Sequence, residues 1–80
     1  MELHIISPLK QWSIAVAWVE LNTTVGNFVI EIEHAPTVLT LAAHSAVIFG
    51  LENGKQDSMI IVSGLAHIQR DSVTLLLSEV

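Results

Sequence analysis

The 80-residue chain contains no cysteine, only three basic residues and no apolar run longer than the six residues at 14–19. Without cysteine, neither a disulfide framework nor a thiolate metal site can form. Nucleic-acid backbones are bound by clustered Lys and Arg, whereas Lys10, Lys55 and Arg70 are scattered, so we expect no nucleic-acid partner. A membrane-spanning helix needs about 20 apolar residues, so we also expect no membrane insertion.

The composition is nevertheless apolar: 51% of the residues are hydrophobic and 14% charged, with a mean hydropathy of +0.61 and a formal net charge of −5. Disordered chains combine low hydrophobicity with high charge, so this composition predicts a folded domain. So small a domain has too much surface to bury all of its apolar side chains. A contiguous exposed patch would mark a contact site, and we expect a permanent partner or self-association; an apolar-rich monomer is the alternative.

Apolar residues recur with a period of two, which is typical of strands and not of helices. In 28–33 they alternate with two carboxylates, Glu31 and Glu33, which predicts a half-buried strand with both carboxylates on its exposed face. The segment 73–78 alternates in the same way. In 14–19 both alternating sets are apolar, so that strand is expected to be covered on both sides.

Turn residues divide the chain into short strands. Pro8 and Pro36 cannot donate to a strand ladder, and Asn53-Gly54 is typical of a type I′ hairpin turn. These signals predict one domain over residues 1–80 of all-β class, an antiparallel β-sandwich or flattened barrel of about eight to ten short strands. The segment 37–46 stays ambiguous, because Pro36 also suits the first position of a helix. We place strands near 2–6, 12–21, 27–33, 37–41, 45–51, 56–63, 65–69 and 72–78.

No pattern of reactive residues predicts catalysis or metal binding. Four histidines lie 30, 10 and 23 residues apart, too far for a compact ligand motif: His4, His34, His44 and His67. Ser63-Gly64 lacks the second glycine of a nucleophile elbow, and Glu31 with Glu33 reads as a solvated strand face. We predict no catalytic residue, no cofactor and no metal. The alternative is a small enzyme or metal module that uses the two carboxylates with His34 and His44.

Trp12 and Trp18 are the largest side chains and lie six residues apart. On a continuous strand an even spacing places both on one face. Tryptophan is enriched at interface hot spots, yet in a small domain it belongs more often to the core. We expect Trp18 in the core, and for Trp12 the core and the interface interpretations stay open.

The most specific stretch is 26–36, which reads GNFVIEIEHAP. It resembles the N-terminal β-sandwich domain of the epsilon subunit of F-type ATP synthases, which typically reads Gly-x-Phe/Leu-Gly-Ile-Leu-Pro-x-His-Ala-Pro. The first Gly, the Phe, the Ile and the closing His-Ala-Pro stand in register. The segment 1–8 resembles the first strand of that family, 60–68 its Val-Ser-Gly-Gly segment and 72–77 its last strand. The resemblance therefore extends over nearly the whole chain.

The resemblance implies a non-catalytic subunit of the central stalk, the rotor that couples ion flow through the membrane to ATP synthesis. In the family this domain packs on the gamma subunit and seats against the polar loops of the ring of c subunits, the c-ring. The gamma contacts map onto Ser7 and His34. The c-ring-facing loop maps onto Asn22, Thr23, Thr24, Val25, Gly26, Asn27, Phe28 and Val29.

Several positions depart from the family pattern. Val29, Ile32 and Glu33 replace a Gly, a Pro and a variable residue, which predicts a longer strand where relatives turn. The resemblance implies a divergent short form, because the C-terminal helical hairpin of relatives would begin at 79–80. It also implies a peripheral location on the cytoplasmic face of an energy-transducing membrane, a bacterial plasma membrane. The alternative function is a free-standing β-sandwich interaction module outside the rotary complex, self-associating or bound to another partner.

Overall fold

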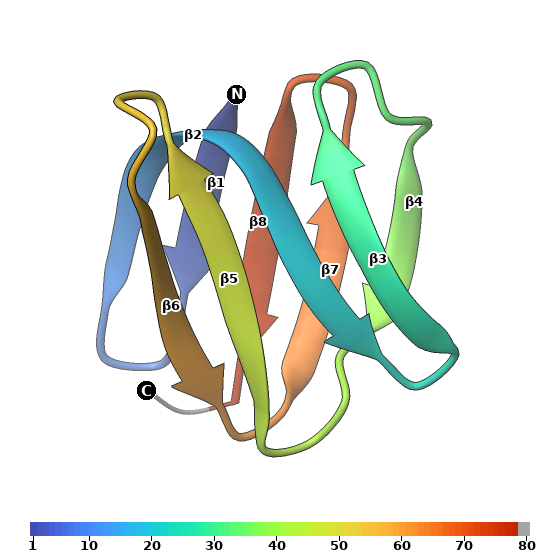
Figure 1. The fold of residues 1–80 in the computed structure, drawn as a ribbon. Helices are drawn as coiled ribbons and strands as arrows, with labels where there is room; N and C mark the ends of the chain where they lie inside the picture. The colour runs from blue at the N-terminus through green and yellow to red at the C-terminus, as the bar shows by residue number, and fades with distance from the viewer. Residues whose placement is uncertain (79–80) are drawn as a thin grey trace.

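The computed structural model describes residues 1–78, which form eight strands and no helix, so no helix in this range could cross a membrane (Figure 1). The junction with a helical hairpin, expected at 79–80, lies outside the described residues. The strands are β1 (Glu2–Ile6), β2 (Gln11–Thr23), β3 (Gly26–Glu31), β4 (Thr37–Thr40), β5 (Ser45–Leu51), β6 (Gln56–Ile61), β7 (Gly64–Ile68) and β8 (Ser72–Leu77).

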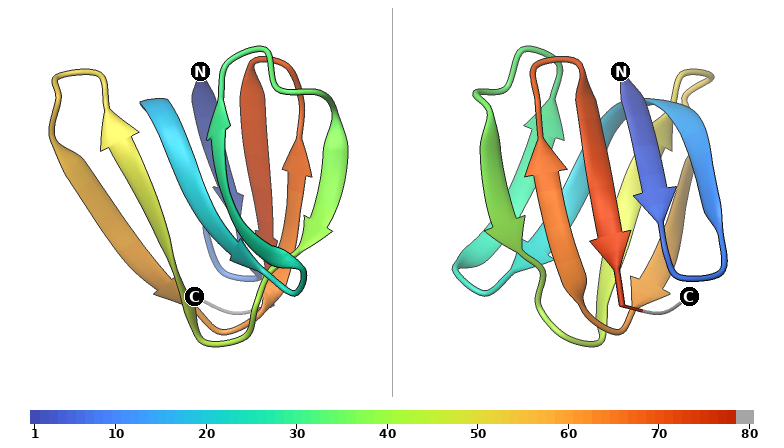
Figure 2. Two further views of the ribbon diagram at one scale, coloured as in Figure 1. Left: turned by 45° about the vertical axis from the view of Figure 1, so that its right-hand side comes forward. Right: turned by 180° about the vertical axis from the view of Figure 1, so that it is seen from behind.

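The strands form two layers that share the long strand β2 (Figures 1 and 2). Sheet A contains β4, β7, β8, β1 and the first half of β2, whereas sheet B contains β3, the second half of β2, β5 and β6. An isolated bridge between Thr23 and Leu41 connects the far end of β2 back to sheet A. The all-β sandwich, with an open flattened-barrel shape, confirms the predicted fold class.

A β-bulge lets β2 pass from one layer to the other. Val16 pairs with Leu51, but Trp18 pairs with Gly50, so Ala17 is the extra residue on the bulged strand. A bulge bends a strand and increases its twist, which suits a strand that turns from one sheet into the next. The same segment is held by the amino terminus of Met1, which donates to the carbonyl oxygen of Val16 at 2.9 Å.

The bulge changes which face each side chain of β2 occupies. Val16 and Val19 are both fully buried although they are three residues apart, and Ala17 is exposed between them. Trp12 therefore packs against the core, whereas Trp18 lies half-buried on the outer face of sheet B, over Gly50. Three predictions were wrong: Trp18 does not lie in the core, the tryptophans do not share a face, and this strand is not covered on both sides.

One strand pair is parallel, although wholly antiparallel pairing was expected. β1 pairs with β8 in parallel, from Glu2 opposite Ser72 to Ile6 opposite Leu76. Antiparallel neighbours can be joined by a tight turn, but parallel neighbours need a long connection. Here almost the entire chain serves as that connection, because the first and the last strand lie side by side in the middle of sheet A.

The core lies between the two sheets and follows the period of two predicted for the strands. In β8, Val73, Leu75 and Leu77 are buried while the residues between them are not. The side chains with the smallest exposure also come from β1, β2 and β3, including Leu3, Ile5, Val16, Val19, Leu21 and Ile30. Every buried side-chain nitrogen or oxygen of the described residues has a hydrogen-bond partner.

β3 is shorter than predicted, because it ends at Glu31 and not at residue 33. Glu33 adopts a left-handed backbone conformation with a φ of 71°, and its N–H donates to the carbonyl oxygen of Arg70 at 2.6 Å. That conformation cannot continue a strand. Glu31 and Glu33 consequently do not share a strand face, and the chain turns here despite the loss of the family proline.

The structure also decides two turn assignments. Residues 37–40 form a strand, so the helical interpretation of 37–46 is wrong. In the β5–β6 hairpin only Gly54 has a positive φ, of 90°, whereas a type I′ turn needs one at Asn53 as well. The N–H of Gly54 donates to Leu51 and that of Leu51 to Lys55, which closes a three-residue loop in place of the predicted two-residue turn.

The connections between strands gather at two ends of the sandwich (Figure 1). We call the lower one in this view the Ser7 end; it carries the connections 7–10, 24–25, 41–44 and 62–63. The upper one, the Arg70 end, carries 32–36, 52–55 and 69–71.

Candidate functional site

Residues 22–29, expected as a c-ring-facing loop, form the β2–β3 hairpin. Asn22 pairs with Asn27 and Thr23 with Gly26, so only Thr24 and Val25 remain as turn residues. The segment is therefore mostly paired strand and not the loop that the family resemblance implied. Its turn lies at the Ser7 end.

The hydroxyl of Thr23 organises the turn. Thr23 is 7% exposed, and its Oγ1 donates to the carbonyl oxygen of Gly26 at 2.7 Å and accepts from the N–H of Val25 at 3.2 Å. Gly26 has a φ of 134°, a conformation that side chains with a Cβ rarely adopt. The turn is thus held in one shape by its own residues.

Sheet A braces the hairpin from the other side. The N–H of Thr24 donates to the carbonyl oxygen of Thr40 at 3.0 Å, and that of Ala42 donates to Asn22 at 2.8 Å. Buried or partly buried backbone hydrogen bonds of this kind restrain a hairpin that would otherwise fray. The tip is consequently hydrogen-bonded to both sheets.

On the outer face of sheet B, amide side chains form hydrogen bonds across the hairpin and to β5. Nδ2 of Asn27 donates to Oε2 of Glu20 at 3.1 Å and to Oδ1 of Asn22 at 3.0 Å. Nδ2 of Asn22 donates in turn to the carbonyl oxygen of Ala46 at 3.2 Å. This network gives Glu20, the one carboxylate near the hairpin, a hydrogen-bond partner.

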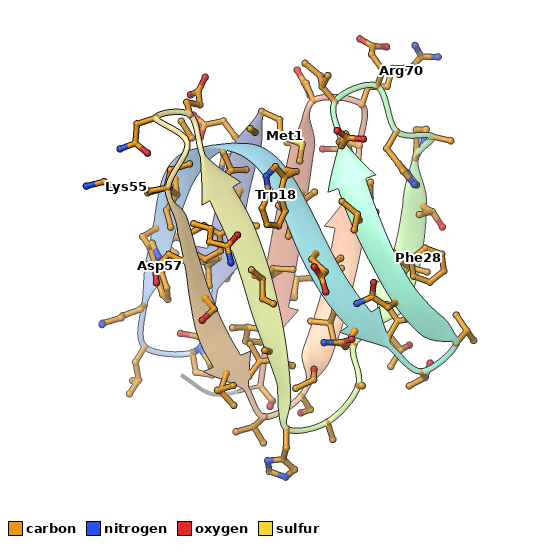
Figure 3. All side chains as sticks on the ribbon, in the orientation of Figure 1. Met1, Trp18, Phe28, Lys55, Asp57 and Arg70 are labelled. Atoms are coloured by element: carbon orange, nitrogen blue, oxygen red, sulfur yellow. The ribbon has the colours of Figure 1, made fainter. Side chains whose placement is uncertain are left out.

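The predicted contact residues of the hairpin fall into two groups. Thr23 is buried and Phe28 packs half-buried against the core, so both support the hairpin from within (Figure 3). Asn22 is half-buried. The residues that a partner could reach directly are Thr24, Val25, Gly26, Asn27 and Val29.

Ser7 lies at the Ser7 end but is hardly accessible. It is 9% exposed, and both its N–H and its hydroxyl donate to the carbonyl oxygen of Lys10, at 2.8 and 3.2 Å. Its side chain closes the turn 7–10, which leaves the neighbouring Leu9 exposed.

His34 lies at the Arg70 end, in the connection between β3 and β4. It is half-buried, and its Nδ1 donates to the carbonyl oxygen of Ala35 at 2.9 Å. Beside it Arg70 and Glu33 form an exposed ion pair at 3.3 Å. The structure therefore places Ser7 and His34 at opposite ends of the sandwich and does not bring them together.

The sequence analysis missed an apolar row on the outer face of sheet A. Leu65 of β7 lies opposite Leu76 of β8, which lies opposite Ile6 of β1, and all three are exposed. In each of the three strands, the other residues that face outward are polar. Only the register of three strands distant in sequence aligns them.

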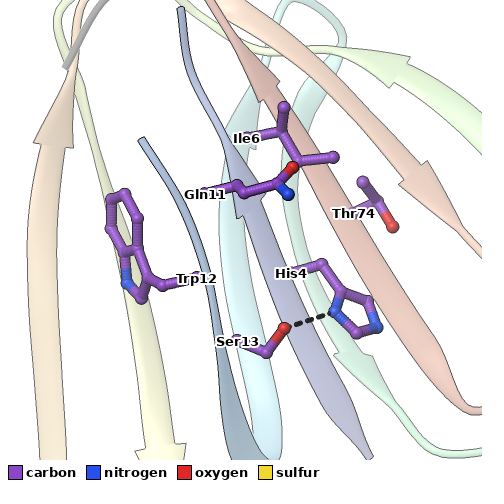
Figure 4. A pocket seen from close by; sticks show the side chains of 6 residues that line it. All are labelled: His4, Ile6, Gln11, Trp12, Ser13 and Thr74. Atoms are coloured by element: carbon purple, nitrogen blue, oxygen red, sulfur yellow. Dashed lines mark hydrogen bonds between the residues drawn. The ribbon is translucent and has the colours of Figure 1, made fainter. Parts of the chain in front are cut away.

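A shallow pocket of about 340 Å³ lies on this face, between β8, β1 and β2 (Figure 4). Nδ1 of His4 and Oγ of Ser13 are 2.7 Å apart within it, and Gln11 and Thr74 contribute further polar groups. Hydroxyl and imidazole without a carboxylate or an oxyanion site do not form a hydrolase triad. Among residues 1–78, moreover, no three His, Asp or Glu are grouped to hold a metal ion.

Comparisons with known proteins give a family model and solved structures that match this β-sandwich. The family model of the ATP synthase delta/epsilon chain β-sandwich domain matches residues 1–80. A chain of the Euglena gracilis mitochondrial ATP synthase, solved by cryo-EM as OSCP, F1 and c-ring in rotational state 1, is similar with a TM-score of 0.81 and 28% identity; the match covers 96% of this chain and 49% of that one.

A second similar chain comes from the central stalk and c-ring of the Tetrahymena thermophila mitochondrial ATP synthase. Its TM-score is 0.81 at 11% identity, with 99% of this chain and 63% of that chain covered, and it shows the shared fold. Curated protein sequences give no significant match. The present chain spans about half the length of the Euglena chain.

The family model spans the same residues in which the sequence patterns at 1–8, 26–36, 60–68 and 72–77 were found. The strands on which these patterns fall, β1, β3, β6, β7 and β8, belong to one two-layer sandwich of eight strands. This chain belongs to the family of ATP synthase delta/epsilon chain β-sandwich domains.

Proposed function

We propose that the chain is a non-catalytic part of the rotor of a rotary ATP synthase, where it links the gamma subunit of the central stalk to the c-ring. The observation that carries this proposal is the family match over residues 1–80. The similar Euglena chain comes from an assembly that includes F1 and the c-ring, which supports it. The chain then lies peripherally at an energy-transducing membrane.

The proposed role is mechanical. Torque passes through a contact only when both surfaces keep their shape under load, and paired strands with cross-strand contacts are stiff. The β2–β3 hairpin fits this requirement, because the N–H of Thr24 and the carbonyl of Asn22 are bonded to residues 40 and 42 of the neighbouring layer. No bond is made or broken on the domain.

We assign the c-ring contact to the exposed part of the hairpin, and the gamma contact to the surface around His34. Thr23 and Phe28, which face inward, act as supports of the hairpin. Ser7, whose hydroxyl is bonded to Lys10, acts as a positioning residue for the turn 7–10.

Co-expression with the cognate gamma subunit tests the proposal. We expect a stable one-to-one complex in size-exclusion chromatography with mass detection. A chain that elutes without gamma, as a monomer or as its own dimer, would contradict the stalk assignment. A self-associating interaction module outside the rotary complex would then be the better description.

His34→Ala tests the gamma contact within that complex. We expect it to raise the Kd for gamma about tenfold, the loss typical of one contact in the interior of an interface. Glu52→Ala is the matched control, because Glu52 is exposed in the β5–β6 connection at the same end. If gamma binds the His34 variant as tightly as the control, the gamma surface lies elsewhere on the domain.

A further inference from the structure

β6 is an edge strand with one free side. It ends the strand order, so β5 is its one neighbour among residues 1–78. The N–H of Leu51 donates to the carbonyl oxygen of Lys55, which sets the alternation of bonded and non-bonded pairs in this hairpin. By that alternation the backbone N–H and C=O groups of Gln56, Ser58 and Ile60 point away from β5. Unpaired groups of this kind can pair with a strand of another molecule.

The sequence around the end of β6 favours such pairing. Residues 59–62 read MIIV, an apolar run rich in β-branched side chains, and Ile60 is 71% exposed. Short runs with high β-propensity, no charge and no proline promote association between strand edges. On the other side of the sandwich, the bond from Thr24 to Thr40 joins the β2–β3 turn to the edge strand β4. β6 pairs with no second strand in the described part of the chain.

Asp57 places a charge on the inward face of this edge strand. Residues two apart in a strand share a face. Met59 packs against the core and Ile61 is buried, so Asp57 stands at an inward position of β6, opposite Phe49. It is nevertheless exposed, because no strand of residues 1–78 flanks β6 on its free side (Figure 3). Inward-pointing charges are one means by which proteins protect edge strands from pairing.

The carboxylate of Asp57 also occupies one of the free backbone donors. Its Oδ1 accepts a hydrogen bond from the N–H of Ser58 at 2.8 Å. Ser58 lies between Gln56 and Ile60, so its N–H is the central one of the donors that point away from β5. Another strand could bond this N–H only after displacing the carboxylate.

We infer that Asp57 prevents the edge of β6 from pairing with a second copy of this chain. A second copy is the relevant occupant, because the apolar run 59–62 can pair with the same run of another molecule. In an antiparallel pair of identical strands, inward residues lie opposite inward residues. The registers with the longest overlap place Asp57 opposite Met59 or Ile61 of the second copy, and a shifted register places it opposite the second Asp57.

Each of these arrangements is unfavourable for a carboxylate. Covering it with apolar side chains costs free energy, because nothing there replaces its hydration. Placing it directly opposite a like charge on the neighbouring strand is also destabilising. The inference goes beyond the proposed function and holds whether or not the chain is part of a rotor.

Asp57→Asn tests the inference, because it removes the charge and keeps a carbonyl oxygen that can accept from Ser58. We expect it to dimerise at protein concentrations about tenfold lower than the parent chain does, since each dimer no longer covers two unpaired carboxylates. Size-exclusion chromatography with mass detection over a concentration series measures this. Glu52→Gln is the matched control: it removes one carboxylate from the exposed connection of the same hairpin and should associate as the parent does.

Two further measurements locate the effect. Asp57→Lys restores an inward charge of the opposite sign, so it should associate no more readily than the parent. Hydrogen exchange at the amides of Gln56 and Ile60 should slow in associated Asp57→Asn and stay fast in Glu52→Gln. Circular dichroism checks that each variant is folded.

Three results would overturn the inference. The first is an Asp57→Asn variant that associates no more readily than the parent. The second is equal association of Glu52→Gln, which would make net charge and not position the cause. The third is association of Asp57→Asn without slower exchange at Gln56 and Ile60, which would place the contact away from the edge of β6.

Discussion

At the scale of single residues, two glycines show how closely this small domain is packed. Gly64 of β7 lies opposite Leu77 of β8, and a Cβ there would overlap the backbone carbonyl oxygen of Leu76. Gly50 of β5 lies under the indole of Trp18, so a Cβ there would overlap a side chain. A half-buried indole can rotate away, whereas a paired strand cannot shift without losing hydrogen bonds of its ladder.

We expect Gly64→Ala to lower the free energy of unfolding by about 3 kcal/mol and Gly50→Ala by about 1 kcal/mol, since overpacking costs most where backbone must move. Urea denaturation followed by circular dichroism measures both. Tryptophan fluorescence should change only in the Gly50 variant, in which the indole is displaced. Equal losses in the two variants would contradict the distinction between backbone and side-chain overlap.

At the scale of elements, hydroxyl groups shape two turns at the Ser7 end, 7–10 and 24–25. Oγ of Ser7 and Oγ1 of Thr23 each bond to a carbonyl oxygen three residues further along the chain. Both hydroxyls belong to buried residues, so the bonds compete little with water. The turns therefore present Leu9 and Val25 without help from a partner.

Thr23→Val should lower the free energy of unfolding by about 1–2 kcal/mol. Valine is nearly isosteric with threonine but removes the hydroxyl that bonds the N–H of Val25 and the carbonyl oxygen of Gly26. Thr24→Val, exposed and one residue along, is the matched control and should stay within about 0.5 kcal/mol. Hydrogen exchange at the amide of Val25 should quicken only in the first variant. A comparable loss in the control would show that the hydroxyl of Thr23 is not responsible.

At the scale of the whole molecule, the two ends of the chain close the fold. β1 lies between β8 and β2, so the first strand cannot detach without splitting sheet A. Its inward side chains Leu3 and Ile5 are fully buried in the shared core. Pairing residues separated by almost the whole chain is entropically demanding, so we expect unfolding to be cooperative.

Ile5→Ala should lower the free energy of unfolding of the whole domain by about 2–5 kcal/mol, because it leaves a cavity between the sheets. The slope of the denaturation curve should stay unchanged, as expected for a two-state transition. Val38→Ala on the exposed face of the edge strand β4 should change stability by about 0.5 kcal/mol or less. A biphasic curve for Ile5→Ala would contradict closure of the fold by β1.

The positions of the strands could be read from the sequence because they depend on short-range features. The alternation in 72–77 and the prolines at 8 and 36 act within a few residues, and the structure has strand boundaries close to those expected. Glu33 is the exception, because its positive φ is stabilised by Arg70, 37 residues away. Local alternation could not reveal that interaction.

The candidate site was only partly predictable, for a related reason. The family pattern at 26–36 pointed to the hairpin, but the burial of Ser7 and Thr23 follows from their turns and from sheet A. The apolar row of Ile6, Leu65 and Leu76 was missed, because these residues meet only through strand register.

The sequence by itself determined the all-β class, the approximate strands and the family, since period-two alternation, turn residues and motifs are properties of neighbouring residues. Tertiary structure alone decided the bulge at Ala17, the parallel pairing of β1 with β8 and the separation of Ser7 from His34. The physical reason is that register and partner choice depend on contacts between residues far apart in the chain. Which side chains become accessible for binding is settled by those contacts.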